Sequence, residues 1–251
     1  MVALITGATA GFGKATAILL AKNGYDLILC GRRKDRLDEL EETIKKNYDS
    51  KVISLCFDIR NYDAVKTAIA SVSSNAEPID ILINNAGLAS GLSNIHEGNI
   101  EDWEKMIDTN VKGLLYMTRC IAPSMIARKK GHIINVGSIA GKEVYINGNV
   151  YCATKFAVDA LNKAMRIELV SHGIKVSSIN PGMAETEFSL VRFHGDEERA
   201  KNVYKGIDAL SAEDIAETIF WIISRPAHVN INELIIMPAA QASTSVTIRK
   251  E

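Results

Sequence analysis

The feature that most constrains the fold is a regular alternation of short apolar runs with longer amphipathic segments. The apolar runs are expected strands, and they lie at Val2–Thr6, Asp26–Cys30, Val52–Phe57, Ile79–Ile83, His132–Val136, Lys175–Ile179 and Leu234–Met237. The segments between them have helical periodicity, at Lys14–Asn23, Asp35–Tyr48, Asp63–Ser73, Trp103–Arg128, Val150–His172 and Glu213–Ser224. Strands that alternate with helices pair in parallel and carry helices on both faces of the sheet. The pattern therefore predicts a doubly wound α/β fold of the Rossmann type with a seven-stranded parallel sheet.

No linker, repeat or low-complexity block interrupts this alternation, so residues 1–251 are predicted to form a single domain. Residues 1–135 are the expected cofactor-binding half, and residues 136–251 the expected catalytic and substrate-binding half. The charged stretch Pro181–Ala209 shows no clear strand. We expect residues 182–209 to lie over the carboxyl edge of the sheet, where open α/β folds bind their ligands.

Composition excludes several classes of protein. The chain has 29 Lys and Arg against 30 Asp and Glu, and a nucleic-acid surface would require a basic excess. No stretch of about 18 apolar residues is present, and no targeting signal is visible at the N-terminus, so no membrane partner is expected. The four cysteines form no Cys-x-x-Cys pair, which fits a reducing, cytoplasmic location. The five histidines form no ligand cluster, and no metal is expected.

A glycine-rich turn follows the first expected strand, in the sequence Thr6-Gly7-Ala8-Thr9-Ala10-Gly11-Phe12-Gly13. Glycines allow the backbone to turn sharply and to approach a pyrophosphate closely. The helix that follows offers free N–H groups and the positive end of its dipole to phosphates. The turn therefore predicts a dinucleotide site that includes Gly7, Thr9, Gly11, Phe12 and Gly13.

The end of the second strand indicates which dinucleotide binds. Enzymes that use NAD usually have an acidic residue there, which holds the ribose hydroxyl. This chain has Arg32 and Arg33 instead. A guanidinium suits the 2′-phosphate of NADP, although an exposed start to the next helix would also explain the two arginines. Asp58, which precedes Ile59 after the third strand, is the expected partner of the adenine amino group.

The sequence Asn84-Asn85-Ala86-Gly87 ends the fourth expected strand. Gly87 would allow close approach of the backbone to the cofactor, and the asparagines would tie neighbouring strand ends together. We assign Asn85, Ala86 and Gly87 to the cofactor site, although a generic turn also uses Asn and Gly.

A tyrosine and a lysine are placed for acid–base chemistry. In Tyr151-Cys152-Ala153-Thr154-Lys155, positions i and i+4 share one face of a helix. A free tyrosine has a pKa of about 10 and is a poor base at neutral pH. A neighbouring ammonium and an oxidised nicotinamide both favour the phenolate. We therefore expect a lowered pKa for Tyr151, which would let it act as general acid and base.

Two polar residues complete this group. Ser138 follows the fifth strand, where its hydroxyl would hold a substrate oxygen against Tyr151. Asn110 lies within a long helical pattern although asparagine is a mediocre helix former. It is either a bend or exposed polar position, or a residue whose side chain or carbonyl holds a water near Lys155.

The residues Asn110, Ser138, Tyr151 and Lys155 resemble the catalytic tetrad of the short-chain dehydrogenase/reductase family. The resemblance extends from Thr6 to the last strand, with several motifs in the family's order. It implies the strand order 3-2-1-4-5-6-7 and a homotetramer. It also implies that Lys155 binds the nicotinamide ribose, that Pro181 and Gly182 pass the nicotinamide, and that Thr186 contacts its carboxamide.

A narrower resemblance is carried by Asp102-Trp103-Glu104, Met106–Asn110, Glu187–Phe193 and Pro226–Asn232. These segments are similar to those of NADP-dependent 3-hydroxy acid dehydrogenases, also called serine or L-allo-threonine dehydrogenases. The resemblance implies oxidation of serine, allo-threonine or 3-hydroxypropionate-type acids, or reduction of the matching semialdehydes or keto acids. A sulfoacetaldehyde reductase branch resembles the same group.

Such a small anionic substrate needs an anchor, and Arg192 is the expected one. Apolar neighbours suggest that its segment is partly buried, and a buried guanidinium needs an anionic partner. The alternative is a structural salt bridge to an acid at positions 196–198. Tyr145, Ser138 and Tyr151, with Gln241 from this chain or a neighbouring one, would add hydrogen bonds to the substrate.

Two other functions remain open. A general carbonyl or ketoacyl reductase would share the tetrad but lack a pocket that binds an anionic substrate. A non-catalytic cofactor-binding regulator is disfavoured, because it would keep the glycines and lose the tetrad.

Overall fold

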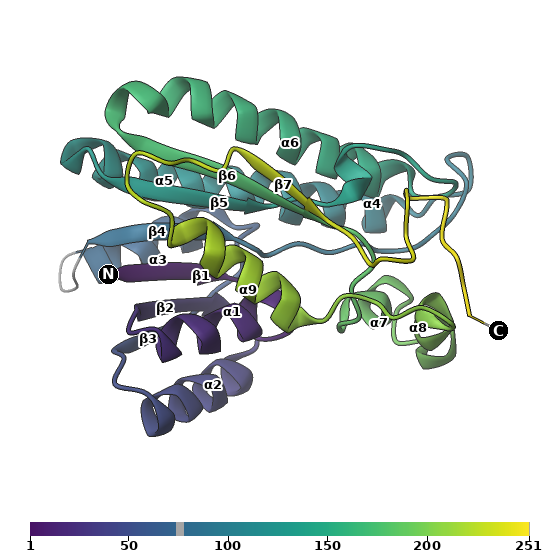
Figure 1. The fold of residues 1–251 in the computed structure, drawn as a ribbon, viewed down its shortest axis with the longest axis horizontal. Helices are drawn as coiled ribbons and strands as arrows, with labels where there is room; N and C mark the ends of the chain where they lie inside the picture. The colour runs from purple at the N-terminus through teal and green to yellow at the C-terminus, as the bar shows by residue number, and fades with distance from the viewer. Residues whose placement is uncertain (74–77, 251) are drawn as a thin grey trace.

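The computed structural model describes residues 1–73 and 78–250, and a seven-stranded parallel sheet forms its centre (Figure 1). The strand order is β3-β2-β1-β4-β5-β6-β7, which confirms the predicted order. The strands are β1 (Val2–Thr6), β2 (Asp26–Gly31), β3 (Val52–Cys56), β4 (Ile79–Asn84), β5 (Gly131–Val136), β6 (Ile174–Pro181) and β7 (Glu233–Ile236). The order reverses between β1 and β4, which is where open α/β sheets form their ligand crevice.

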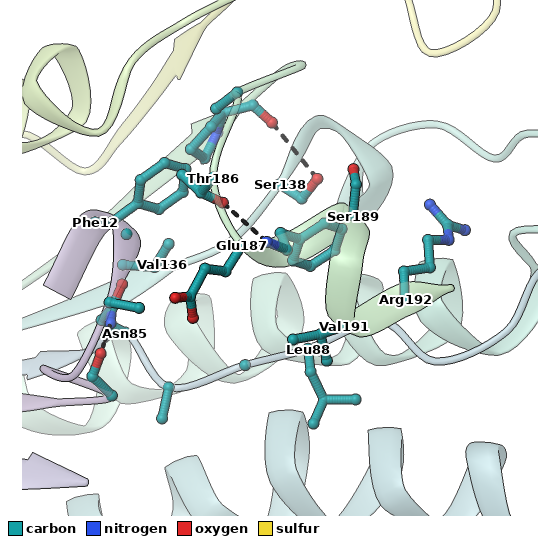
Figure 2. Close-up of a pocket in the computed structure, with 18 of the residues that line it drawn as sticks. Phe12, Asn85, Leu88, Val136, Ser138, Thr186, Glu187, Ser189, Val191 and Arg192 are labelled. Atoms are coloured by element: carbon teal, nitrogen blue, oxygen red, sulfur yellow. Dashed lines mark hydrogen bonds between the residues drawn. The ribbon is translucent and has the colours of Figure 1, made fainter. Parts of the chain in front are cut away.

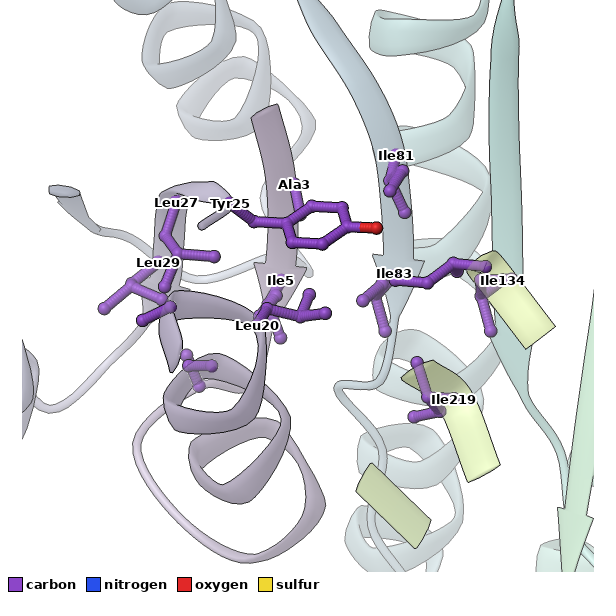
Figure 3. Close-up of a cluster of buried hydrophobic side chains, with 14 of the residues drawn as sticks. Ala3, Ile5, Leu20, Tyr25, Leu27, Leu29, Ile81, Ile83, Ile134 and Ile219 are labelled. Carbon is purple, nitrogen blue, oxygen red and sulfur yellow. The ribbon is translucent and has the colours of Figure 1, made fainter. Parts of the chain in front are cut away.

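Alternate residues of each central strand pack against helices on opposite faces of the sheet. In β1, Ala3 and Ile5 belong to a buried cluster, part of which Figure 3 shows. This cluster includes residues of α1 (Gly11–Lys22), α2 (Lys34–Asn47) and α9 (Ala212–Ile223). Val2 and Leu4 belong to a second cluster, with residues of α3 (Tyr62–Ser73), α5 (Leu114–Arg128) and α6 (Asn149–Leu169). Because both faces are covered, the strands read as continuous apolar runs in the sequence.

Besides the helices of these two clusters, the helix α4 (Ile100–Ile107) precedes α5 in the chain. The predicted helix Trp103–Arg128 is in fact divided. A π-helical turn at Asp108–Gly113 separates α4 from α5. Such turns are rare and frequently lie at functional sites, and this one contains Asn110.

The expected segment 182–209 contains more structure than its sequence pattern predicts. Two short helices form there, α7 (Phe188–Arg192) and α8 (Glu197–Tyr204). The side chain of Asp196 accepts a hydrogen bond from the Arg199 N–H and so caps α8. Figure 1 shows α7 and α8 beside the chain's C-terminal tail, away from the long helices that cover the sheet.

Within residues 1–73 and 78–250, no helix combines the length and the apolar character needed to cross a bilayer.

Candidate active site

A cavity of about 520 Å³ opens at the carboxyl ends of the strands. It is lined by residues that follow β1, β2, β3, β4, β5 and β6, together with α7 and the C-terminal tail. Almost all the residues predicted for the site line this cavity: Gly7, Thr9, Gly11, Phe12, Arg32, Arg33, Asp58, Ile59, Asn85, Ala86, Gly87, Ser138, Tyr145, Tyr151, Lys155, Pro181, Gly182, Thr186, Arg192 and Gln241. Gly13 and Asn110 are not part of its lining, and both lie behind it.

In the glycine-rich turn, the glycines let the backbone bend sharply and pack closely against its neighbours. Gly7 and Gly11 have φ angles of +67° and +50°, which residues other than glycine rarely adopt. A Cβ on Gly13 would lie 2.4 Å from the Gly7 carbonyl oxygen and 2.6 Å from the Asn85 amide nitrogen. Gly13 therefore lets α1 pack directly on the turn, and the helix N-terminus stays open to an anion. This geometry fits the phosphates of a dinucleotide.

The arginines at the end of β2 lie at one end of the cavity. Arg33 donates from Nε and Nη2 to the Thr9 hydroxyl, at 3.1 and 2.9 Å. Arg32 lies 3.7 Å from Asp58, whose carboxylate also accepts hydrogen bonds from Arg60. Although burial opposes ionisation of Asp58, the hydrogen bonds from Arg60 hold its pKa below the ordinary value. This end of the cavity thus combines cations with carboxylates, of which Asp58 is one.

The asparagines at the end of β4 tie neighbouring strands together, as predicted. Asn84 donates from Nδ2 to Asn135 on β5 at 2.9 Å. Asn85 donates to the backbone carbonyl of Thr6 at 2.8 Å, and the Thr6 hydroxyl accepts from the Asn85 and Ala86 N–H groups. These bonds fix the turn that carries Gly87 beside the cavity.

Tyr151, Ser138 and Lys155 converge at the other end. Ser138 follows β5, and its hydroxyl lies near enough to the Tyr151 phenol on α6 to lower the pKa of that phenol. The Lys155 ammonium lies 6.0 Å from the centroid of the Tyr151 ring and donates to the Val136 carbonyl at 2.9 Å. Tyr151 is 8% exposed and Lys155 6%, so both groups are shielded from water.

The expected lowering of the Tyr151 pKa is wrong for this structure. Burial raises the pKa of the phenol above its ordinary value, and the nearby Ser138 and Arg192 offset this only in part. Burial also lowers the pKa of Lys155 to about 8, because a dry environment disfavours its charged form as well. The sequence shows that these two residues are neighbours, but it does not show how strongly both are desolvated.

Asn110 supports the site from behind. Its side chain accepts from the Leu88 N–H at 2.8 Å and donates to the Leu88 carbonyl at 2.8 Å and to Thr154 at 3.0 Å. These bonds hold the chain after Gly87 against α6. Since the side-chain amide is engaged in this way, the backbone carbonyl is the better candidate for the proposed contact to water.

Arg192 points into the cavity from α7 and has no carboxylate partner among the described residues. Its Nη2 donates to the Tyr145 hydroxyl at 2.7 Å, and its Nε donates to the Gly91 carbonyl at 3.3 Å. The guanidinium carbon lies 5.7 Å from the centroid of the Tyr151 ring. Within the described ranges 1–73 and 78–250, no ion pair involves Arg192, so the alternative salt bridge to residues 196–198 does not form.

Gln241 lines the cavity of its own chain. Its Oε1 accepts from the Met183 N–H at 2.8 Å, and its Nε2 donates to the Ser243 carbonyl at 3.1 Å. Gln241 therefore joins the C-terminal tail to the segment that begins at Gly182.

Two other residues of the lining, Phe188 and Glu187, make contacts that the sequence pattern did not predict. The Phe188 ring packs edge-on against Tyr151, with centroids 5.5 Å apart. Glu187 forms ion pairs with Arg33 and Arg36. More than 150 residues separate Glu187 from those arginines along the chain, so no local signal marks the contact.

The comparisons with known proteins agree with this geometry. The model of the short chain dehydrogenase family matches residues 1–196, and the chain belongs to this family. It is similar to the NADP-dependent 3-hydroxy acid dehydrogenase YdfG of Salmonella typhi, with 45% identity over 100% of both chains. It is also 42% identical to serine 3-dehydrogenase of Agrobacterium fabrum, over 99% of this chain and 98% of the relative.

Among solved structures, the closed form of serine dehydrogenase complexed with NADP⁺ matches with a TM-score of 0.92 and 43% identity, over 100% of both chains. A serine dehydrogenase from Escherichia coli matches with a TM-score of 0.83 and 40% identity, over 96% of this chain and 100% of that chain. The fold of a short-chain dehydrogenase is therefore shown over the full length.

Across residues 1–73 and 78–250, no group of three or more His, Cys, Asp or Glu side chains is arranged to hold a metal ion.

Proposed function

We propose that this protein oxidises small 3-hydroxy acids with NADP and reduces the corresponding semialdehydes or keto acids. The observation that carries the proposal is the position of Arg192. Its guanidinium lies beside the hydroxyl-bearing pair Tyr145 and Tyr151, without a carboxylate partner in the described chain. A substrate carboxylate would supply the missing charge in a bidentate bond. The similarity to enzymes named for 3-hydroxy acids and serine supports the same substrate class.

The site residues divide between cofactor and substrate. The open N-terminus of α1 and the turn at Gly7 and Gly11 would hold the pyrophosphate. Arg32 and Arg33 would hold the 2′-phosphate, and Asp58 would hold the adenine. Asn85–Gly87, Lys155 and the segment from Pro181 to Thr186 would line the nicotinamide end. Residues 1–135 thus carry most of the cofactor site, and residues 136–251 the chemistry.

NADP, when bound, supplies the hydride acceptor or donor of this reaction. Ser138 would hold the substrate oxygen, and Tyr151 would take the hydroxyl proton during oxidation or return it during reduction. Because burial raises the pKa of the phenol, a nearby positive charge is needed to favour the phenolate. Lys155 supplies one such charge, and its pKa of about 8 leaves most of it protonated at neutral pH.

The decisive experiment compares kcat/KM for serine, allo-threonine and 3-hydroxypropionate with NADP and with NAD. We expect at least a tenfold preference for NADP, the scale of a lost charge-assisted contact. Equal use of NAD would contradict the assignment of Arg32 and Arg33. In the reductive direction, a preference for sulfoacetaldehyde would favour the reductase branch. A preference for neutral carbonyls would favour a general carbonyl or ketoacyl reductase.

We further propose that the protein is a cytoplasmic homotetramer. Apolar side chains are exposed on α5 and α6, among them Leu115, Phe156 and Ile167, which supports association of copies through these helices. The four cysteines are free, which suits a reducing compartment. Light scattering should give the mass of four 27.4 kDa chains, and a monomer mass would contradict the proposal.

A further inference from the structure

Glu187 joins the segment 182–209 to the cations at the end of β2. It immediately precedes α7, and its Oε2 accepts a hydrogen bond from Arg33 Nη1 at 2.9 Å. Its other oxygen, Oε1, accepts from Arg36 Nη1. Although burial opposes ionisation, the hydrogen bonds from Arg36 and Arg33 hold the pKa of the Glu187 carboxyl below its ordinary value. The residue is therefore a carboxylate at neutral pH.

Figure 2 shows that Glu187 and Arg192 leave the same segment in different directions. The Glu187 side chain extends into the pocket on the side where Phe12 and Asn85 lie, whereas Arg192 lies on the opposite side. One end of α7 thus faces the phosphate end of the cavity, and the other faces the chemical end.

The Arg33 guanidinium is shared between two partners. Its Nε and Nη2 donate to Thr9 at the glycine-rich turn, and its Nη1 donates to Glu187. A 2′-phosphate that bound Arg33 would meet a guanidinium already paired with a carboxylate. Arg33 and Arg36 together carry two positive charges, and Glu187 neutralises one of them.

We propose that Glu187 is a specificity-determining residue that competes with the cofactor's 2′-phosphate for Arg33. This rests on the proposed function, in which Arg33 holds that phosphate. The carboxylate lowers the affinity for phosphorylated cofactor, because it repels the phosphate and occupies Nη1. When the phosphate takes that position, Glu187 gives up Arg33, and the contact that ties α7 to the cofactor-binding half is reduced to Arg36.

The test uses two fragments that differ only in the 2′-phosphate. Binding of adenosine 2′,5′-bisphosphate and adenosine 5′-monophosphate is measured by calorimetry on the wild type, Glu187→Gln and Glu185→Gln. Glu185 is the matched control, since it is an exposed acid on the same segment outside the cavity lining. We expect Glu187→Gln to bind the bisphosphate about threefold to tenfold more tightly, given partly exposed charges screened by water. Monophosphate binding should not change, nor should Glu185→Gln alter either affinity.

Added salt should reduce this gain in affinity, because salt screens the repulsion between Glu187 and the phosphate that the substitution removes. An unchanged or weaker affinity of Glu187→Gln for the bisphosphate would overturn the competition, provided that the wild type distinguishes the two fragments. If neither the wild type nor Glu187→Gln distinguishes the two fragments, the assignment of Arg33 to the 2′-phosphate fails instead. Glu187→Ala provides a second variant without the amide, and it should show the same direction.

Discussion

At the scale of single residues, burial shifts the pKa values of Tyr151 and Lys155, both on α6, in opposite directions. It raises the pKa of Tyr151 and lowers the pKa of Lys155 to about 8, so each group alone is pushed toward its neutral form. A tyrosine that is neutral at rest is well suited to donate a proton during reduction. During oxidation it needs the nearby cations to become a base.

Replacement of Tyr151 by Phe keeps the ring that packs on Phe188 and removes only the hydroxyl. We expect NADPH to bind normally and turnover to fall by at least about a hundredfold, the lower scale of general acid–base effects. Tyr116→Phe is the control, since Tyr116 packs on Tyr62 away from the cavity. Near-normal turnover in Tyr151→Phe would show that another group moves the proton.

The lowered pKa of Lys155 predicts that the stability of the protein depends on pH. Its pKa falls from 10.5 to about 8 on folding, so between these values the unfolded chain binds more protons at this residue. The contribution of Lys155 to the free energy of unfolding therefore rises with pH through that window and is lost as the pH falls toward 8. Relative to Lys155→Met, the free energy of unfolding of the wild type should rise by roughly 2–3 kcal/mol between about pH 7.5 and 10. Urea denaturation of both proteins measures it, and parallel pH profiles would contradict it.

At the scale of elements, the junction of β1 and α1 depends on close backbone contact. Gly13 brings the first turn of α1 against the carbonyl of Gly7, and the Asn85 amide lies against the same point. The glycine-rich turn is thus held by β4 as well as by its own helix. A side chain at Gly13 would move the helix N-terminus relative to the turn.

We therefore expect Gly13→Ala to destabilise the protein by about 1–3 kcal/mol, as overpacking does, and to weaken NADP binding. Gly24→Ala is the control: Gly24 has a φ of +77° but open space around it, so it tests backbone strain alone. Thermal unfolding and calorimetric titration with NADP separate the two effects. Loss of stability with unchanged NADP affinity would show that the contact does not shape the phosphate site.

At the scale of the whole molecule, Arg192 connects parts of the chain that are far apart in sequence. It belongs to α7, donates to Tyr145 after β5, and donates to Gly91 after β4. The Gly91 N–H in turn donates to the Arg192 carbonyl at 2.9 Å. The segment 182–209 is thus docked on the substrate end by the residue proposed to bind the substrate.

If Arg192 anchors the substrate anion, Arg192→Leu should lower kcat/KM for a 3-hydroxy acid by roughly tenfold to a hundredfold. A neutral aldehyde of similar size should be affected much less. Arg199→Leu is the matched control, because Arg199 lies on the same segment, stacks on Phe193 and does not line the cavity. Equal losses on both substrates, with a lower melting temperature, would make Arg192 a structural residue.

The family resemblance implied the strand order, whereas the residues themselves predicted the sheet and the groups at its carboxyl edge. Local patterns carry this information: apolar runs buried on both faces, the glycine spacing from Gly7 to Gly13, and the i, i+4 pair Tyr151 and Lys155. Each of these signals arises within a few residues, so each is visible without the fold.

How these residues meet depends on contacts between distant segments, which the sequence patterns do not reveal. The π-helical turn around Asn110 depends on contacts with Leu88 and Thr154, so helical periodicity alone did not reveal it. The pKa directions follow from burial, which depends on every element packed around the pair. The partners of Arg192 and Glu187 come from distant segments, and charge in the sequence does not specify which opposite or polar group lies within reach.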